Sequence, residues 1–154
     1  MMAQDRVMEA VQAHFEHVNW RATAGVCHVD DAFVWTCHVD GRTYTGPGGY
    51  ATYLDTWRRA FPDCWYEVQS FAVAGPVVVC QMTMRGTHRS LLETAFGLIA
   101  ATGKPIDLPL CEIFRTCGGR LVAIESYFDL GTLVRQLGRC PEYRLQPLQM
   151  LLTN

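Results

Sequence analysis

Residues 103–131 read GKPIDLPLCEIFRTCGGRLVAIESYFDLG, and their pattern decides the fold. Apolar, β-branched and aromatic residues fill two runs, roughly 105–116 and 120–128, which predict two β-strands. The pair Gly118-Gly119 between them predicts a tight turn, because glycine adopts the positive φ angles that such turns need. Two long strands joined in this way indicate an antiparallel hairpin near the end of the chain.

The rest of the chain is predicted to place helices first and most strands later. Apolar residues at helical spacing predict helices at 3–18, 20–28, 50–61 and 130–137, with a break at the glycines of 46–49 and with Asp129 capping the last helix. Alternating residues predict further strands at 32–38, 42–45, 64–73 and 77–87, and the segment 88–102 is less regular and could cover a pocket. This order predicts an α+β fold, in which a curved antiparallel sheet wraps around the N-terminal helices and forms a cone-shaped pocket.

Size and composition indicate one compact domain. The chain has 154 residues, of which 49% are hydrophobic and 18% charged, and its net charge is −2. We assign residues 1–139 to a single domain and residues 140–154 to a C-terminal tail that docks on the surface or in a subunit interface. There is no cluster of Lys and Arg, no apolar run near the roughly 20 residues of a membrane helix, and no signal-peptide pattern. We therefore expect a cytoplasmic protein without nucleic-acid or membrane partners.

The seven cysteines do not indicate a metal site. No two of them have the Cys-x-x-Cys spacing of zinc ligands. In a reducing cytoplasm such thiols mostly fill the core. No zinc site is therefore expected.

Glu112 is the first candidate for chemistry. Strand alternation puts Leu110, Glu112 and Phe114 on one face, so the carboxyl would share an apolar surface. A charge is costly to bury there, and burial would raise the pKa of the carboxyl toward neutrality, as a general acid or base requires. The alternative is a carboxylate on the outer face of the sheet, paired with Arg85 or Arg115.

His14 is the second candidate. It lies between Val11 and Val18 on the apolar stripe of the first predicted helix. It could carry a proton or orient Glu112 as its hydrogen-bonded partner. The alternative is a core histidine whose ring nitrogens are satisfied by other groups.

Several motifs along the chain together resemble a known family. They are Asp30-Asp31-Ala32-Phe33-Val34, Ala60-Phe61-Pro62-Asp63, Arg85-Gly86-Thr87-His88, Ala101-Thr102-Gly103-Lys104-Pro105 and Tyr127-Phe128-Asp129. Over about residues 5–138 the chain resembles the SnoaL-like polyketide cyclases of the nuclear transport factor 2-like superfamily, which includes ketosteroid isomerases and limonene-epoxide hydrolases. The resemblance implies a cone with the active site inside, no metal, no organic cofactor, and a dimer or higher homo-oligomer formed through the outer sheet face.

The carboxylates of the family's active sites are largely replaced in this chain. Ser126 stands where the cyclases and epoxide hydrolases have a catalytic Asp. Gln81 and Thr83 fall near the Arg-x-Asp pair of the epoxide hydrolases, and Thr36 falls near the base of the isomerases. The resemblance therefore disfavours epoxide hydrolysis by an activated water.

Two positions keep a polar group in altered form. Glu112 falls where the isomerases place the protonated Asp of their oxyanion hole. His14 falls where the isomerases place their oxyanion Tyr. The resemblance thus implies that both side chains point into the cone.

The remaining candidates are binding residues. Gln81, Thr83 and Ser126 could hold a carbonyl or hydroxyl oxygen of a substrate, and the alternative for each is a buried side chain bonded to the backbone. Thr36 or His38 could line the mouth of the cone. Trp57 and Phe128 could wall a flat polycyclic ligand together with Trp35, Tyr50, Tyr53 and Trp65, although core packing is the default for any one of them.

These expectations combine into a cofactor-independent acid/base enzyme of secondary metabolism, such as antibiotic biosynthesis. It would cyclise, isomerise or dehydrate a polyketide-like apolar small molecule, with Glu112 and His14 as the catalytic pair. One alternative is a non-catalytic ligand-binding or assembly module on the same fold, because the family's carboxylates are absent at Ser126, Thr83 and Thr36. Another is an epoxide-opening cyclase in which Glu112 protonates the epoxide.

Overall fold

The computed structural model describes residues 2–20, 28–94 and 97–139. The helices are α1 (Met2–Trp20), α2 (Gly46–Ala60) and α3 (Leu130–Gln136). The strands are β1 (Val29–Cys37), β2 (Arg42–Thr45), β3 (Trp65–Ala74), β4 (Val77–Thr87), β5 (Leu92–Thr94), β6 (Gly97–Ile99), β7 (Pro105–Cys117) and β8 (Arg120–Phe128). The short helix expected at 20–28 and the tail expected at 140–154 fall mainly or wholly on residues outside this description.

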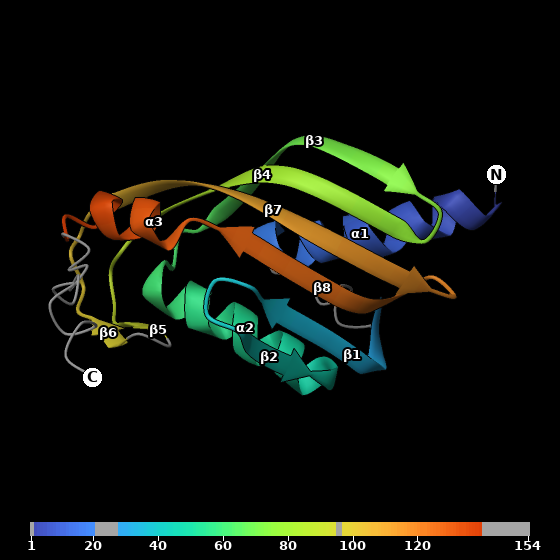
Figure 1. Ribbon diagram of the computed structural model, residues 1–154, viewed down its shortest axis with the longest axis horizontal. Coiled ribbons are helices and arrows are strands. Elements are labelled where there is room, and N and C mark those ends of the chain that lie inside the picture. Colours follow the sequence, from blue (N-terminus) through green and yellow to red (C-terminus); the bar gives the residue numbers. More distant parts are fainter. Residues whose placement is uncertain (1, 21–27, 95–96, 140–154) are drawn as a thin grey trace, which may run out of the picture.

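A curved six-stranded sheet forms the body of the molecule and confirms the α+β prediction. The strands are ordered β2-β1-β8-β7-β4-β3, and the sheet curves over α1 while α2 packs against β1 and β2 (Figure 1). One feature differs from the prediction, because β1 pairs with β8 in parallel and the sheet is therefore mixed. These two strands are far apart in the sequence and no hairpin joins them, and the alternation of residues along a strand does not reveal the direction of its partner.

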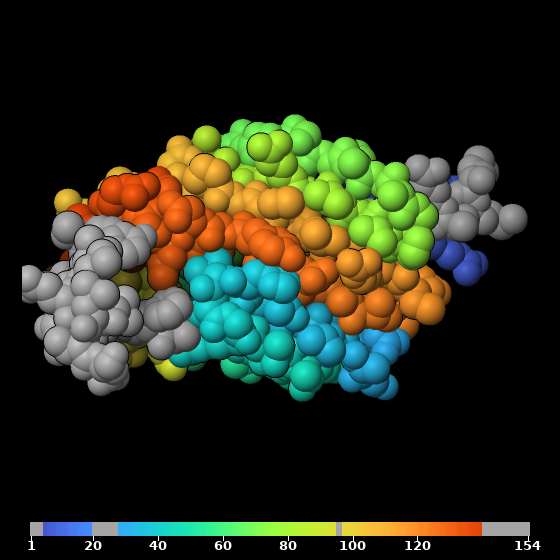
Figure 2. Space-filling view, in the orientation of Figure 1, coloured from blue at the N-terminus to red at the C-terminus, as the bar shows by residue number. Residues whose placement is uncertain are grey.

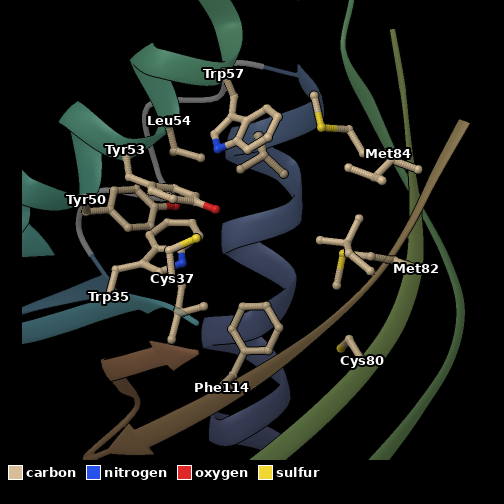
Figure 3. Packing of buried hydrophobic residues seen from close by; sticks show 14 of the residues in the cluster. Trp35, Cys37, Tyr50, Tyr53, Leu54, Trp57, Cys80, Met82, Met84 and Phe114 are labelled. Carbon is tan, nitrogen blue, oxygen red and sulfur yellow. The ribbon is translucent and has the colours of Figure 1, made fainter. Parts of the chain in front are cut away.

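Strand alternation separates the two faces of the sheet. In β7 every second residue is buried, from Ile106 to Thr116, and Glu112 lies in this series. The inner face packs on α1 and α2, where aromatic side chains of α2 and β1 gather on one side of α1 and Cys80, Met82 and Met84 of β4 on the other (Figure 3). The predicted inward face of β7 is therefore confirmed.

Helix α2 begins earlier than predicted. The glycine-rich stretch that was expected to break the chain is its first turn, with Thr45 as the N-cap and Pro47 as the second helical residue, where a missing N–H costs nothing. Gly49 allows this turn to lie directly on β2. A Cβ atom at Gly49 would be 2.7 Å from the carbonyl carbon of Tyr44.

Gly49→Ala is expected to destabilise the protein by about 1–3 kcal/mol, because the added methyl group meets backbone that cannot move aside cheaply. Gly48→Ala is the matched control, since a Cβ there would have no neighbour within 4 Å. It should leave stability unchanged or raise it by up to about 1 kcal/mol, because alanine favours a helix over glycine. Urea unfolding of the two variants makes the comparison, and equal stabilities would show that the contact with Tyr44 is unimportant.

The segment 88–102 contains a short hairpin, β5 paired with β6, where an irregular segment was expected. The hairpin contacts α2 through β5, and Leu92 of β5 is buried in the core. This part of the chain is thus anchored against α2.

Across the described residues, no helix combines the length and the apolar character needed to cross a membrane.

Candidate active site

Four strands bring one row of side chains together on the inner face of the sheet. Cys37 of β1 pairs with Ser126 of β8, Ser126 pairs with Glu112 of β7, and Glu112 pairs with Cys80 of β4. All four side chains are buried. The row therefore places one carboxyl and one hydroxyl side by side in an otherwise apolar interior.

Glu112 is only 2% exposed, and its carboxyl is held by a chain of two hydrogen bonds. The hydroxyl of Ser126 donates to Oε1 of Glu112 at 2.7 Å. The indole Nε1–H of Trp35 donates in turn to Oγ of Ser126 at 2.8 Å. Residues from β1, β8 and β7 thus orient a single carboxyl group.

His14 faces the same carboxyl from α1. Its Nε2 lies 3.9 Å from Oε2 of Glu112, and its Nδ1 lies 2.9 Å from the hydroxyl of Tyr50 on α2. The ring centroids of Trp35 and Phe114 lie 5.7 and 5.1 Å from that of the imidazole. The imidazole is therefore fixed between two helices and the sheet, with one nitrogen directed at the carboxyl.

Burial dominates the protonation of the pair. It raises the pKa of Glu112 from 4.5 to about 7, and the hydrogen bond from Ser126 only partly opposes this. Burial lowers the pKa of His14 from 6.5 to about 3, assisted by the nearby charges of His17 and Arg58. At neutral pH the imidazole is uncharged, so the contact at 3.9 Å is not an ion pair, and the carboxyl is poised between its two forms.

Neutral tyrosines complete the surroundings. Burial raises the pKa values of Tyr50, Tyr53 and Tyr66, and the Coulomb effect of Glu112 acts in the same direction on all three. Their hydroxyl groups stay protonated at neutral pH and remain hydrogen-bond donors.

A small cavity lies next to the cluster formed by Glu112, Ser126, Trp35 and His14, toward the ends of β1 and β8. Trp57, Tyr53, Cys37 and Phe128 line it, with Arg42 and Glu93 among its more polar walls. Cys37, which pairs with Ser126, and Phe128, two residues beyond Ser126 on β8, both line the cavity, so it begins level with Ser126 and extends past it along the strands. Its volume is about 30 Å³, enough for one or two water molecules. A larger ligand must therefore move side chains to reach Glu112.

Four predicted binding residues do not join the site. Gln81 and Thr83 lie on the outer face, where they accept hydrogen bonds from Ser70 and Gln69. The reason is the phase of β4, in which Cys80, Met82 and Met84 take the inward positions. The prediction that Gln81 and Thr83 hold substrate oxygens beside Glu112 is therefore wrong in position.

Thr36 and His38 also lie outside the cone. Phe33, Trp35 and Cys37 take the inward positions of β1, which turns Thr36 outward. His38 bonds Glu125 at 3.1 Å and stacks on Tyr127 at the outer surface. Figure 2 shows the outer faces of β1, β8, β7 and β4 as one continuous surface.

The other predicted residues are inside. Trp57 and Phe128 meet edge to face at 5.5 Å and wall the cavity, and Ser126 binds Glu112. The arginine alternative for Glu112 is excluded, because Arg85 bonds Glu67 and Asp107, and Arg115 bonds Glu125.

The sequence pattern missed two hydrogen-bonding partners. Trp35 and Tyr50 were predicted only as aromatic walls, yet they bond Ser126 and His14. The alternation of β1 and the apolar stripe of α2 signal that both are buried. Their partners depend on the parallel pairing of β1 with β8 and on the packing of α1 beside α2, and no local sequence pattern predicts either.

Among the described residues, no group of three His, Cys, Asp or Glu side chains is placed to hold a metal ion.

Comparison with known proteins gives one family and one fold. The family model described as SnoaL-like polyketide cyclase matches residues 5–137. No curated protein matches in sequence. Among solved structures, a protein of Jannaschia sp. CCS1 described as a SnoaL-like polyketide cyclase has a TM-score of 0.78 and 16% identity, covering 92% of this chain and 97% of its own.

Two further structures share the fold. IdmH from Streptomyces antibioticus, described as a polyketide cyclase, has a TM-score of 0.71 and 20% identity, covering 86% of this chain and 98% of its own. TerC, crystallised with polyporic acid, has a TM-score of 0.69 and 15% identity, covering 86% of this chain and 98% of its own. At these identities the likeness is one of fold.

Proposed function

Because the chain belongs to the SnoaL-like polyketide cyclase family, we propose that it is a cofactor-independent acid/base enzyme acting on a polyketide-like apolar molecule. One observation carries the proposal: the carboxyl of Glu112 is buried among aromatic side chains, and its pKa is raised to about 7. A group that titrates near the working pH can both remove and return a proton. A carboxylate that only stabilised the fold would gain nothing from such a position.

The proposed reaction begins with proton removal. Ionised Glu112 takes the proton from a carbon next to a carbonyl group, and the electrons of the C–H bond form an enolate. The neutral imidazole of His14, whose Nε2 lies 3.9 Å from Oε2 of Glu112, would donate a hydrogen bond to the enolate oxygen, and the neutral hydroxyl of Tyr53 beside Ser126 is a second donor. Such preorganised donors stabilise developing charge in a dry site.

Ring closure would follow within the same molecule. The enolate carbon attacks a second carbonyl carbon, which forms the ring bond and leaves an alkoxide. The alkoxide takes the proton back from Glu112, and the carboxylate is ready for the next turnover. Isomerisation would need only the first step and return of the proton to a different atom. Loss of water after ring closure would give a dehydrated product.

The aromatic walls of the cavity favour a flat substrate, which would enter once side chains move to enlarge it. Trp57 and Phe128 present ring edges and faces to it, and Tyr53 separates it from Trp35 of the Glu112 cluster, with ring centroids 4.1 Å apart. The structural neighbour TerC was crystallised with polyporic acid. A planar polyketide intermediate fits walls of this kind.

A titration of Glu112 tests the proposal before any substrate is known. The carboxyl carbon signal of Glu112, assigned by its loss in Glu112→Gln, is expected to titrate near pH 7, because burial raises its pKa. The carbon NMR signal of Glu125, which lies on the outer face with its pKa lowered by His38 and Arg115, is the internal control. A value near about 4.3 for Glu112 would mean a solvated carboxylate and would remove the main support for catalysis.

A binding module without catalysis is the second candidate. The observation in its favour is that Glu112 is only 2% exposed and does not line the cavity of about 30 Å³, so a ligand held there would not touch the carboxyl. A binder would retain a planar ligand with unchanged affinity in Glu112→Gln and would turn none over. An enzyme would show turnover that depends on the carboxyl.

A further inference from the structure

The two hydrogen bonds at Ser126 have a defined direction. An indole N–H can donate but cannot accept, so Ser126 is the acceptor in the bond from Trp35. The single proton of the Ser126 hydroxyl is then available for Oε1 of Glu112, which lies 2.7 Å away. An ionised carboxylate can only accept. The chain therefore runs from Trp35 through Ser126 to Oε1.

The other carboxyl oxygen has different surroundings. Oε2 faces Nε2 of His14 at 3.9 Å, which is beyond hydrogen-bond length. His14 is held in place through Nδ1 by the hydroxyl of Tyr50. A substrate atom that reached this gap after side chains had moved would face both Oε2 and Nε2. The two oxygens of Glu112 are thus unequal: Oε1 accepts a hydrogen bond from Ser126 of the sheet, whereas Oε2 is directed toward His14 of α1.

We propose that Trp35 is a positioning residue, whose indole fixes the hydroxyl of Ser126 as a donor to Oε1 and thereby confines the transferable proton of Glu112 to Oε2. In this arrangement the Ser126 hydroxyl keeps one orientation whether Glu112 is ionised or protonated, so proton transfer needs no reorganisation of the buried bonds. The competing arrangement puts the proton on Oε1, donating to Ser126, and turns the Ser126 hydroxyl toward Tyr53 of α2, which is also within its hydrogen-bonding reach. The inference rests on the proposed function, since the site of the proton matters for catalysis only if Glu112 reacts.

A double-mutant cycle on the Glu112 titration tests the arrangement. Ser126→Ala is expected to raise the pKa of Glu112 by about 0.5 to 1, because it removes a hydrogen bond that stabilises the carboxylate. Trp35→Phe keeps an aromatic ring near Tyr53 and Tyr50 but frees the Ser126 hydroxyl to rotate, so it should raise the pKa in the same direction. In the Ser126→Ala background, Trp35→Phe should have no further effect, because the indole acts only through Ser126.

A matched control separates this effect from general loss of packing. Trp57→Phe makes the same chemical change in the same core, next to the cavity, and is expected to leave the pKa of Glu112 within about 0.2 of the wild-type value. The proposal is overturned if Trp35→Phe leaves the pKa unchanged, or if it shifts the pKa equally with and without Ser126. Thermal melting of each variant checks that the fold is retained.

The titration needs no substrate, so the result stands even if Glu112→Gln proves fully active and the proposed function fails. Once a substrate is found, Trp35→Phe should also move the acidic midpoint of the kcat/KM profile to higher pH by the same amount as the NMR titration. A loss of activity through disturbed packing alone would lower kcat without moving that midpoint.

Discussion

Glu112→Gln is expected to lower kcat/KM by at least about 100-fold, because the amide can neither remove nor return a proton. The substitution is close to isosteric, and the side-chain oxygen of glutamine can still accept the hydrogen bond from Ser126. Packing and polar contacts are therefore largely kept. The loss should appear mainly in kcat, since the carboxyl contributes to the transition state more than to substrate binding.

Exchange of substrate protons with deuterated solvent provides an assay that does not depend on the final product. A panel of cyclic ketones, 1,3-diketones and poly-β-ketone chains is incubated with the protein, and loss of the proton signal next to each carbonyl is followed by NMR. Glu125→Gln is the matched control, because it makes the same change at the residue before Ser126, whose side chain lies on the outer face. This variant should catalyse the exchange at the wild-type rate.

The magnitude of the loss decides between the two candidate functions. A loss of less than about threefold for the most reactive member of the panel would contradict the role of Glu112, because it is far below the range of general acid/base catalysis. Binding of a panel member without exchange in the wild-type protein would support the binding module instead.

Much of the fold could be predicted from residues 103–131. The strand alternation placed Glu112 inward between Leu110 and Phe114, as the structure confirms. Asp129 caps α3 as predicted, accepting from the N–H groups of Gly131 and Thr132. These features are local, since each depends on neighbours within a few residues. Local patterns therefore sufficed for the hairpin and for the orientation of its carboxyl.

The outer-face residues show where the prediction failed. Gln81 and Thr83 were assigned to the interior from the family resemblance, although the sequence already alternates them with Cys80, Met82 and Met84. Burying the three apolar side chains is more favourable than burying two that need hydrogen-bond partners. The phase of alternation in β4 was thus the better guide.

The hydrogen bond between Trp35 and Ser126 joins residues 91 positions apart, and no local pattern predicts it.

The pH dependence of stability is expected to separate Glu112 from His14. The folded-state pKa of Glu112 is raised from 4.5 to about 7, so its protonated form favours the folded state below pH 4.5, and this contribution is lost as the pH rises to about 7. The folded-state pKa of His14 is lowered from 6.5 to about 3, so its contribution is present above pH 6.5 and is lost as the pH falls. Between about pH 4.5 and 6.5 the two dependences have opposite signs and largely cancel in the wild-type protein.

Glu112→Gln removes one side of this balance. Relative to the wild-type protein, its free energy of unfolding is expected to rise by about 3 kcal/mol between pH 4.5 and pH 7.5, because the cost of ionising a buried carboxyl is gone. Taken alone, the variant should lose stability as the pH falls below 6.5, where the unfolded chain binds a proton at His14 and the folded chain does not.

Urea unfolding at pH 4.5, 5.5, 6.5 and 7.5 measures the free energy of unfolding of both proteins. Subtracting the wild-type value at each pH removes the contributions of the titrating groups that both proteins share. Glu125→Gln is again the control. The pKa of Glu125 is lowered, mainly by its hydrogen bond to His38, so its contribution changes only below about pH 4.5 and with the opposite sign. A difference between Glu112→Gln and wild type that stayed constant from pH 4.5 to pH 7.5 would show that Glu112 titrates normally, because only a raised folded-state pKa makes the two proteins diverge in that interval.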